Sequence, residues 1–487
     1  MVVQVSADLA GSTSSSETIC CPLCVDAEGA LLRANPIVEA WFALLRSRPA
    51  MALLALGRLV RGGTRAFADH VAARTEFAAA RLPYDETVLN RLQQARAGGR
   101  TIALVTALPK SWAAQIAAHL DCIDTVLVHD GEHSWRSGGD GSVLERRFGR
   151  RAFDYVGRAD SPAWAHARGG IAVTAGGSAE AAAQRVPEAT ELIVRARVNW
   201  RTWLKQVRLH QWVKNLLVFV PLVASRRVAD LEMVRAVSTG FLAFGCVASA
   251  SYILNDLLDL PHDRLHPTKR LRPLAAGTLS IRSAITVMTG LLAVSVLLAT
   301  TLPATFAEIL ALYSVGTLGY SLFLKRIAPL DAFALAGLYT LRVLAGNAAS
   351  GLPPSFWLLA FSIFLFLSMA MAKRHAELAQ LNAAAVDFPH GRGYRAGDLQ
   401  MVSQLGVGSG YISVLVLALY LNSPEAAALY RRPDLLWLLC ALLLYWITRL
   451  WLLAHRGELD DDPVVFALRD RGSRIVALCV IVVLLLA

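Results

Sequence analysis

The stretch N-D-L-L-D-L-P-H-D at residues 255–263 closes a long apolar run and decides how the rest of the chain is interpreted. Its three acids stand at positions i, i+3 and i+7, so on a helix they share one face with the asparagine. Oxygen side chains gathered at a membrane boundary suit a hard cation such as Mg²⁺, which takes its other ligands from phosphates and water. The expected metal ligands are Asn255, Asp256, Asp259 and Asp263. A solvated loop that caps a transmembrane helix is the structural alternative.

The chain becomes basic directly after this stretch, with Arg264, His266, Lys269, Arg270 and Arg272. Guanidinium and ammonium groups bind phosphate oxygens through charge-assisted hydrogen bonds. Acids for a cation beside bases for phosphate oxygens predict a site for a diphosphate-containing co-substrate.

Composition divides the 487 residues into two parts. A hydrophobic content of 55% and a mean hydropathy of +0.46 exclude a wholly soluble protein. Up to about residue 205 the chain has the mixture of a globular domain, and beyond it come apolar runs of roughly 15–24 residues, long enough to cross a bilayer. The net charge of +11 does not indicate a nucleic-acid partner, because Lys and Arg also orient membrane proteins.

The membrane part is expected to be all-α and polytopic, with about nine transmembrane helices. They are predicted near residues 212–224, 234–257, 282–300, 303–322, 330–349, 354–372, 402–421, 433–453 and 473–487. Lys and Arg gather in the connections after the second, fourth, sixth and eighth spans. This bias places that side, the N-terminal domain and the expected active site in the cytoplasm.

Several polar residues stand where hydrocarbon should surround them. Arg342 lies in the middle of the fifth span, Asp331 opens that span, and Tyr320 and Lys325 close the fourth. An ionisable residue at membrane depth indicates function by default, because it is costly without a partner. Lys325 and Asp331 can also be interfacial anchors. After the sixth span a second charged cluster consists of Lys373, Arg374 and Glu377, for which a positive flank is equally plausible.

Residues 205–487 resemble the UbiA superfamily of intramembrane prenyltransferases. The resemblance rests on the segment Q-W-V-K-N at 211–215, the N-D-x-x-D-x-x-x-D motif at 255–263, and the order of Tyr320, Lys325 and Asp331. It implies Mg²⁺ as the cofactor, a polyprenyl lipid substrate in the bacterial inner (plasma) membrane, and a set of catalytic residues. These are Asp256, Asp259, Lys325 and Asp331. The family's second Asp-rich motif would place an acid four residues after Asp331, where Leu335 stands.

The run H-P-T-K-R-L-R-P at 266–273 and the K-R-x-x-E cluster at 373–377 are similar to the decaprenyl-phosphate phosphoribosyltransferases. The resemblance implies transfer of a 5-phosphoribosyl group from 5-phosphoribosyl diphosphate to a polyprenyl phosphate. The substrate-binding residues it implies are Lys214, Asn215, Lys269, Arg270, Arg272, Tyr320, Arg342, Lys373, Arg374 and Glu377. The alternatives are a prenyltransferase acting on an aromatic acceptor in quinone or haem biosynthesis, a transporter or lipid-binding scaffold, and a soluble enzyme with a membrane anchor.

Residues 19–180 alternate strands and helices, which predicts an α/β doubly wound parallel sheet. Expected strands are Ile19–Val25, Thr101–Val105, Thr125–Val128 and Ile171–Thr174, and residues 33–81 read as a helical insertion. The expected division is a disordered tail over 1–18, this domain, a linker or interfacial helix over 181–210, and the membrane domain over 211–487.

The N-terminal domain resembles the haloacid dehalogenase superfamily, whose phosphatases carry D-x-D-G-T after the first strand. Asp26 stands at the nucleophile of that motif, Glu28 replaces its general acid, and Thr106 and Asp160 match later motifs. The lysine of the third motif should lie near 136–143, which holds none. A nucleophile without its charge partners is a poor catalyst, so a weak or inactive phosphatase is expected.

Overall fold

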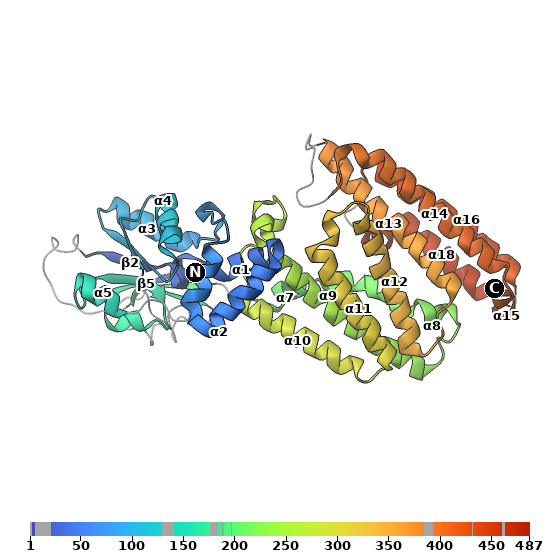
Figure 1. Ribbon diagram of the computed structural model, residues 1–487, viewed down its shortest axis with the longest axis horizontal. Helices are drawn as coiled ribbons and strands as arrows, with labels where there is room; N and C mark the ends of the chain where they lie inside the picture. The colour runs from blue at the N-terminus through green and yellow to red at the C-terminus, as the bar shows by residue number, and fades with distance from the viewer. Residues whose placement is uncertain are drawn as a thin grey trace. The chain divides into compact units, whose positions relative to one another are not determined.

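Figure 1 shows a computed structural model of the chain. The structure describes residues 2–4, 21–128, 141–175, 184, 186, 189–195, 197–383, 393–430, 432–459 and 463–487. The chain divides into two compact units, Met1–Val207 with Ile253–Thr286, and Arg208–Tyr252 with Val287–Ala487. Four predicted features lie partly outside the described residues: the tail at 1–18, the first strand at 19–25, the lysine-free segment at 136–143 and the linker at 181–210.

The membrane part is helical, as predicted, but it has fewer helices of spanning length. Among the described residues seven are long and apolar enough: Leu231–Leu265, Ile281–Ala299, Ala304–Arg326, Leu330–Ser350, Phe356–Gln380, Leu399–Leu421 and Asp434–His455. The predicted spans near 212–224 and 473–487 are shorter. The first is the 3₁₀ segment Leu209–Phe219 followed by α8 (Val220–Ala224), and the second is α18, Arg471–Leu486, with 16 residues. An α-helix of that length reaches about 24 Å, against a hydrocarbon core of about 30 Å.

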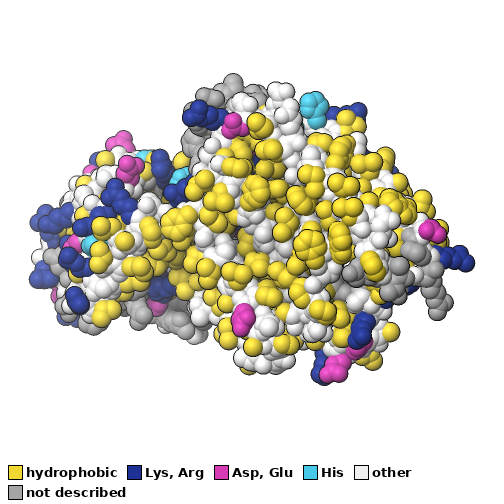
Figure 2. Space-filling view, turned by 45° about the vertical axis from the view of Figure 1, so that its right-hand side comes forward, with side chains coloured by type: hydrophobic (Ala, Val, Ile, Leu, Met, Phe, Trp, Pro, Cys, Tyr) yellow, Lys and Arg dark blue, Asp and Glu magenta, His cyan; other side chains and the backbone are white. Residues whose placement is uncertain are grey.

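The element bounds of the helical part are α9 (Leu231–Leu265), α10 (Ile281–Ala299), α11 (Ala304–Leu322), α12 (Leu330–Ser350), α13 (Phe356–Ala383), α14 (Leu399–Leu421), α15 (Pro424–Leu429), α16 (Trp437–His455) and α17 (Pro463–Arg469). Hydrophobic side chains cover most of the helical face in view in Figure 2. Large apolar side chains such as Leu297, Val315 and Leu485 are 67%, 67% and 74% exposed. So much exposed apolar surface indicates lipid contact, and the chain is an integral membrane protein.

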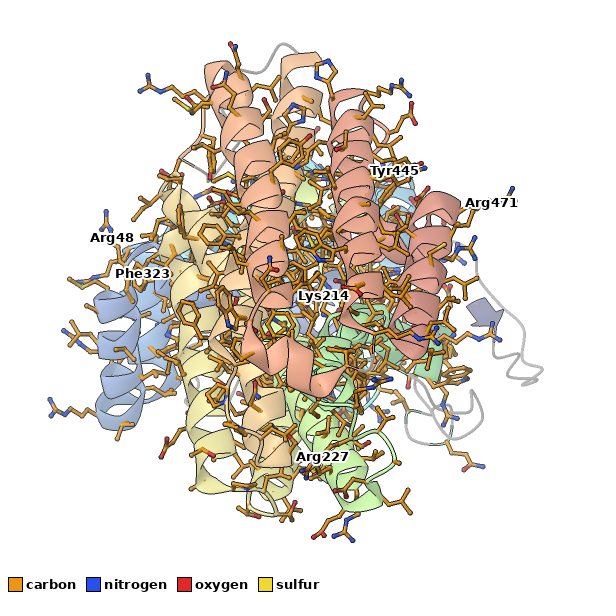
Figure 3. All side chains as sticks on the ribbon, turned by 90° about the vertical axis from the view of Figure 1, so that its right-hand side faces the viewer. Arg48, Lys214, Arg227, Phe323, Tyr445 and Arg471 are labelled. Atoms are coloured by element: carbon orange, nitrogen blue, oxygen red, sulfur yellow. The ribbon has the colours of Figure 1, made fainter. Side chains whose placement is uncertain are left out.

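A glycine lets two helical segments of this unit approach closely. A Cβ on Gly346 of α12 would lie 2.1 Å from the carbonyl oxygen of Val218 in the 3₁₀ segment. Small residues are the usual means of close helix contact in membranes. Figure 3 shows these helices with their side chains.

The first unit contains the predicted α/β domain, with a parallel sheet confirmed. The seven strands have the order β1-β7-β6-β5-β2-β3-β4, and every pairing is parallel except β1 with β7. The strands are β1 (Val2–Gln4), β2 (Leu23–Asp26), β3 (Ile102–Thr106), β4 (Thr125–Val128), β5 (Asp154–Arg158), β6 (Gly169–Ala175) and β7 (Ala189–Arg195). The helices are α1 (Pro36–Ser47) and α2 (Pro49–Ala72) in the predicted insertion, then α3 (Glu86–Ala97), α4 (Lys110–Leu120), α5 (Gly141–Phe148) and α7 (Trp200–Val207).

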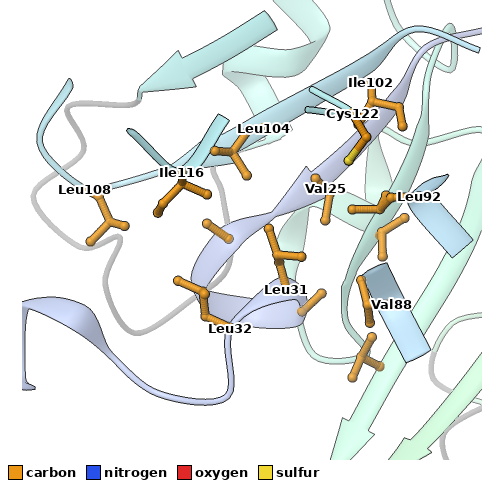
Figure 4. Close-up of a cluster of buried hydrophobic side chains, with 14 of the residues drawn as sticks. Val25, Leu31, Leu32, Val88, Leu92, Ile102, Leu104, Leu108, Ile116 and Cys122 are labelled. Atoms are coloured by element: carbon orange, nitrogen blue, oxygen red, sulfur yellow. The ribbon is translucent and has the colours of Figure 1, made fainter. Parts of the chain in front are cut away.

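The centre of this sheet is apolar because its strands are buried on both faces. Every residue of β2 and β3 is buried, as expected for a central parallel strand covered by helices. Val25, Leu31 and Leu104 belong to the core cluster of Figure 4, in which Leu92 of α3 and Ile116 of α4 are fully buried.

The sheet extends beyond the predicted domain on both sides. β1 lies within the predicted disordered tail, and β7 lies within the predicted linker, which also contains α7. The pairing of β1 with β7 explains the difference, because an edge strand of three residues carries too little pattern to be detected alone.

Candidate functional site

The acidic motif occupies the last turns of α9, and two of its three acids share one guanidinium. Asp256 and Asp263 are 3% and 4% exposed. Arg272 Nη1 lies 3.2 Å from Asp256 Oδ1 and 2.6 Å from Asp263 Oδ2. Arg272, one of the basic residues expected near the motif, is therefore bound to two of its carboxylates.

Asp259 departs from the expected cluster. Its Oδ1 lies 2.8 Å from Nη1 of Arg46, a residue of α1, and the same nitrogen lies 3.1 Å from Nδ1 of His262. Three residues along a helix leave an offset of about 60° from Asp256, which is enough to point Asp259 toward another neighbour. Among the described residues no three His, Cys, Asp or Glu side chains are arranged to hold a metal ion. The three carboxylates therefore do not converge on one point in the described structure, and the metal site at Asn255, Asp256, Asp259 and Asp263 stays a prediction.

Gln206 of α7 is a member of this site that the sequence did not indicate. It is 1% exposed, and its Nε2 donates to Asp256 Oδ2 over 2.9 Å. Its Oε1 and the Oδ1 of Asn255 are buried and have no hydrogen-bond partner in the described part of the chain. Buried oxygens without donors, next to carboxylates, are ligands that a cation can satisfy, so the donor set fits Mg²⁺.

Of the other basic residues after the motif, His266, Lys269 and Arg270 lie on the surface, whereas Arg264 is paired with Glu39. Lys269 and Arg270 are exposed in the 3₁₀ turn Lys269–Leu271. Arg270 also lines a cavity of about 390 Å³ together with Arg33, Arg81 and Arg264. Cationic side chains thus continue from the motif along this loop.

In the second unit, Arg342, which is expected to bind substrate, is held by protein atoms. It is 5% exposed; Nε donates to Asn215 Oδ1 over 2.9 Å, Nη2 to the Tyr313 hydroxyl over 2.8 Å, and Nη1 to the Leu338 carbonyl over 2.7 Å. Its guanidinium also lies 4.8 Å from the centre of the Tyr313 ring. Because every nitrogen of the group has a protein acceptor, Arg342 connects the 3₁₀ segment, α11 and α12.

Lys214 precedes Asn215 in that segment and is buried as well, with 8% exposure. Its Nζ lies 6.0 Å from the centre of the Tyr339 ring. A buried ammonium over an aromatic face is stabilised by the ring's negative face. Lys214 is thus one of the predicted substrate-binding cations that lie inside the helical unit, where Figure 3 labels it.

A second buried cluster joins four predicted residues. Arg374 and Asp331 are 1% and 0% exposed, and Arg374 Nε lies 2.6 Å from Asp331 Oδ2. Arg374 also donates to the Tyr320 hydroxyl over 3.2 Å and pairs with Glu377. Tyr394, which the sequence did not indicate, donates to Asp331 Oδ1 over 2.6 Å. The charge of Asp331 is therefore balanced by a guanidinium, in keeping with the absence of a second acidic pair.

The other two predicted lysines of this unit are more accessible. Lys325, in the turn Leu324–Arg326, and Lys373 of α13 are both half-buried. Both are compatible with a polar group arriving from outside the helices.

In the soluble part the structure brings together three of the four predicted phosphatase-like residues. Asp26 ends β2, and its carboxylate accepts from the Gly29 amide over 2.9 Å and from the Tyr155 hydroxyl over 3.1 Å. Glu28 Oε1 accepts from the Thr106 hydroxyl and from the Ala107 amide, each over 3.0 Å. Burial raises the pKa of Asp26 above its usual range and that of Glu28 to about 7.

The fourth residue, Asp160, is exposed and binds Arg158 over 2.8 Å. It borders a cavity of about 680 Å³ at the carboxyl ends of the parallel strands, which Glu28 also lines. Five arginines line the same cavity: Arg33, Arg65, Arg158, Arg195 and Arg282. With two acids against five cations, the lining favours an anion.

The protein has an acidic motif at the end of an apolar helix and buried charged clusters between membrane helices. These features are typical of an integral membrane protein that binds a charged ligand. The model of the UbiA prenyltransferase family matches residues 216–471, more than half of the chain, and the chain belongs to this family of transferases.

Three relatives show how far the similarity extends. The uncharacterized protein y4nM of Sinorhizobium fredii is 36% identical over 462 residues, which cover 93% of this chain and 88% of the relative. The nodulation protein NoeC of Azorhizobium caulinodans is 35% identical over 281 residues, 57% of this chain and 90% of the relative. The decaprenyl-phosphate phosphoribosyltransferase of Mycolicibacterium smegmatis is 39% identical over 180 residues, 36% of this chain and 56% of the relative. Similarity to the first relative therefore includes both the soluble and the membrane parts.

Proposed function

We propose that this protein transfers a 5-phosphoribosyl group from 5-phosphoribosyl diphosphate to a polyprenyl phosphate such as decaprenyl phosphate, with release of diphosphate. The observation that carries the proposal is the pairing of Asp331 with Arg374. A site for two metal ions and an allylic diphosphate would need a second free acidic motif, whereas here that carboxylate is neutralised by the protein. The similarity to the phosphoribosyltransferase of M. smegmatis supports the same choice.

The proposal assigns Mg²⁺ to Asn255, Asp256, Asp259 and Asp263, with Gln206 as a further oxygen ligand. Bound Mg²⁺ would neutralise the diphosphate and so make it a better leaving group. Arg272 holds Asp256 and Asp263 in place beforehand and supplies positive charge for phosphate oxygens. The surface cations Lys269 and Arg270 would guide the anionic donor to the motif.

The reaction itself needs orientation more than proton transfer. A phosphate oxygen of the lipid forms a bond to the anomeric carbon of ribose, and the bond from that carbon to the diphosphate oxygen breaks with its electron pair. Because the lipid phosphate is already anionic, no strong base is required. We assign its recognition to Lys214, Lys325 and Lys373, while Arg342 and Arg374 hold the buried helices in position.

The test is incubation of the purified protein with Mg²⁺, decaprenyl phosphate and radiolabelled 5-phosphoribosyl diphosphate, followed by extraction into organic solvent. We expect label in the lipid phase, its loss in Asp256→Asn, and no change in Glu308→Gln, which removes an exposed acid of α11. No label from folded protein would refute the proposal. Transfer from an allylic diphosphate to an aromatic acceptor would then identify a quinone- or haem-type prenyltransferase.

We further propose that the soluble part has a haloacid dehalogenase-like fold without strong phosphatase activity, and that it lies in the cytoplasm of a bacterium. The Thr106 hydroxyl and the Ala107 amide, which would bind a phosphate oxygen, already donate to Glu28. The Tyr155 hydroxyl donates a hydrogen bond to Asp26, the expected nucleophile. Phosphate release by the full-length protein should therefore not exceed that of Asp26→Asn; release that this variant abolishes would contradict the proposal.

A further inference from the structure

One helix of the soluble part contacts the acidic motif directly. Nη1 of Arg46, in the last turn of α1, lies 2.8 Å from Asp259 Oδ1 and 3.1 Å from His262 Nδ1. Seven residues earlier on α1, Glu39 Oε2 accepts from Arg264 Nη1 over 2.7 Å. A spacing of seven places Glu39 and Arg46 on the same helix face, so α1 meets the end of α9 at two points.

These contacts are sheltered from water. The side chains of Arg46 and Asp259 are 13% and 27% exposed, and those of Glu39 and Arg264 are 7% and 10% exposed. Ion pairs at this depth are screened less than surface pairs, and breaking one costs more. The geometry therefore belongs to the fold and is not an accident of flexible surface chains.

The helix that carries Arg46 is itself fixed. Asn35 caps α1, with its Oδ1 accepting from the amides of Ile37 and Val38. The indole of Trp41 donates to the Ala52 carbonyl over 2.9 Å, which ties α1 to α2. The insertion thus presents Arg46 from a rigid support.

We propose that the soluble part completes the transferase site, with Arg46 as a diphosphate-binding residue. The inference rests on the proposed function and extends it. Without substrate, all three acids of the motif hold guanidiniums: Arg272 for Asp256 and Asp263, and Arg46 for Asp259. When a cation and a diphosphate bind together, the carboxylates pass to the cation and the guanidiniums to phosphate oxygens. Every charged group keeps a partner of opposite charge in this exchange, which keeps its energetic cost low.

The exchange predicts two effects of opposite sign when Arg46 is removed. A cation alone competes with Arg46 for Asp259, so its affinity should rise. The diphosphate loses a charge-assisted hydrogen bond, so its affinity in the presence of Mg²⁺ should fall. If Arg46 only joined two parts of the protein, its removal would change stability but would not raise the cation affinity and lower the diphosphate affinity together.

The experiment compares full-length wild type with Arg46→Ala, Arg46→Lys and, as a control, Arg48→Ala, which removes an exposed arginine two residues away. Mn²⁺ binding is followed by electron paramagnetic resonance, and binding of inorganic diphosphate with Mg²⁺ by calorimetry. For Arg46→Ala we expect Mn²⁺ to bind several-fold more tightly and diphosphate about tenfold or more weakly, with Arg46→Lys between. Arg48→Ala should match wild type in both measurements.

Each other outcome decides against the inference. Unchanged diphosphate affinity in both Arg46→Ala and Arg46→Lys would overturn it. If Arg46→Ala does not fold, Arg46→Lys alone decides, because lysine keeps the charge but lacks the planar fork of arginine. Tighter diphosphate binding without Arg46 would make the residue a plug rather than a ligand, and also overturn it. If wild type binds neither Mn²⁺ nor diphosphate, the proposed function itself fails, and the two failures are thereby distinguished.

Discussion

Replacing Arg374 by methionine should destabilise the helical unit severely, because the substitution leaves a buried carboxylate without its partner. Asp331 is 0% exposed and lies 2.6 Å from the Arg374 guanidinium, and Glu377 loses the same group. Removing one member of a buried ion pair costs about 3–5 kcal/mol. At roughly 2–4 °C per kcal/mol, the midpoint of thermal unfolding should fall by on the order of 10 °C.

The reverse substitution should cost less. In Asp331→Asn, Arg374 keeps Glu377 and the Tyr320 hydroxyl, so a loss of about 1–3 kcal/mol is expected. The double variant Asp331→Asn/Arg374→Met removes both charges and should be more stable than Arg374→Met alone, with a coupling energy of about 2 kcal/mol.

Thermal unfolding of the four proteins in detergent, followed by circular dichroism, measures this cycle. Additive single effects, or an Arg374→Met protein that unfolds within about 2 °C of wild type, would refute the argument from burial. The same proteins test the role of Asp331 in transfer. If Asp331 supports the fold, activity should return in part with the stability of the double variant, whereas a catalytic carboxylate would allow no return.

Three further predictions follow from single contacts. Gly346→Ala should destabilise the helical unit by about 1–3 kcal/mol in thermal unfolding, because its Cβ would meet the Val218 carbonyl at 2.1 Å, while Gly337→Ala on the same helix, with nothing within 4 Å, should be neutral or slightly stabilising. The pKa of Glu28 is raised to about 7 against an ordinary 4.5, so its contribution to the stability of the soluble part should be complete below pH 4.5. The free energy of unfolding should then fall by about 3 kcal/mol as the pH rises through 7. Glu28→Gln should flatten that slope in unfolding midpoints between pH 5 and 8, and an equal slope would contradict the assignment. Asp256→Asn should lower transfer at least a hundredfold while the unfolding midpoint stays within a few degrees; a wild-type rate would remove Asp256 from the site.

Local patterns in the sequence predicted what depends on neighbours in the chain. The two-part architecture, the parallel sheet and most membrane helices follow from hydropathy and period. The two shortest predicted spans are not confirmed, because hydropathy measures composition, whereas the helices found there are shorter than the hydrocarbon core. β1 and β7 were missed because their pairing joins residues 2–4 to residues 191–193, which lie far apart in the sequence.

Contacts across long separations account for what the sequence could not predict about the site. The spacing of the motif placed Asp256 and Asp263 together correctly, but nothing in it indicates that Asp259 meets Arg46, 213 residues earlier in the chain. Gln206 was hidden for the same reason, since a lone glutamine in an amphipathic helix has no distinctive signal. Partners of buried charges are set by tertiary packing, which single-sequence patterns do not record.

The distribution of unsatisfied groups argues for where a ligand enters. Arg342 and the pair of Asp331 with Arg374 have protein partners on their charged atoms, so the helical unit is stable without a substrate ion at these positions. Around Asp256 the carboxylates hold arginines, and the amide oxygens of Gln206 and Asn255 beside them have no donor in the described part of the chain. A site that pairs its charges but leaves neutral oxygens unmet is stable when empty and gains most from a cation. This combination supports the proposed cation at the end of α9 and the proposed role of the other buried charges in the scaffold.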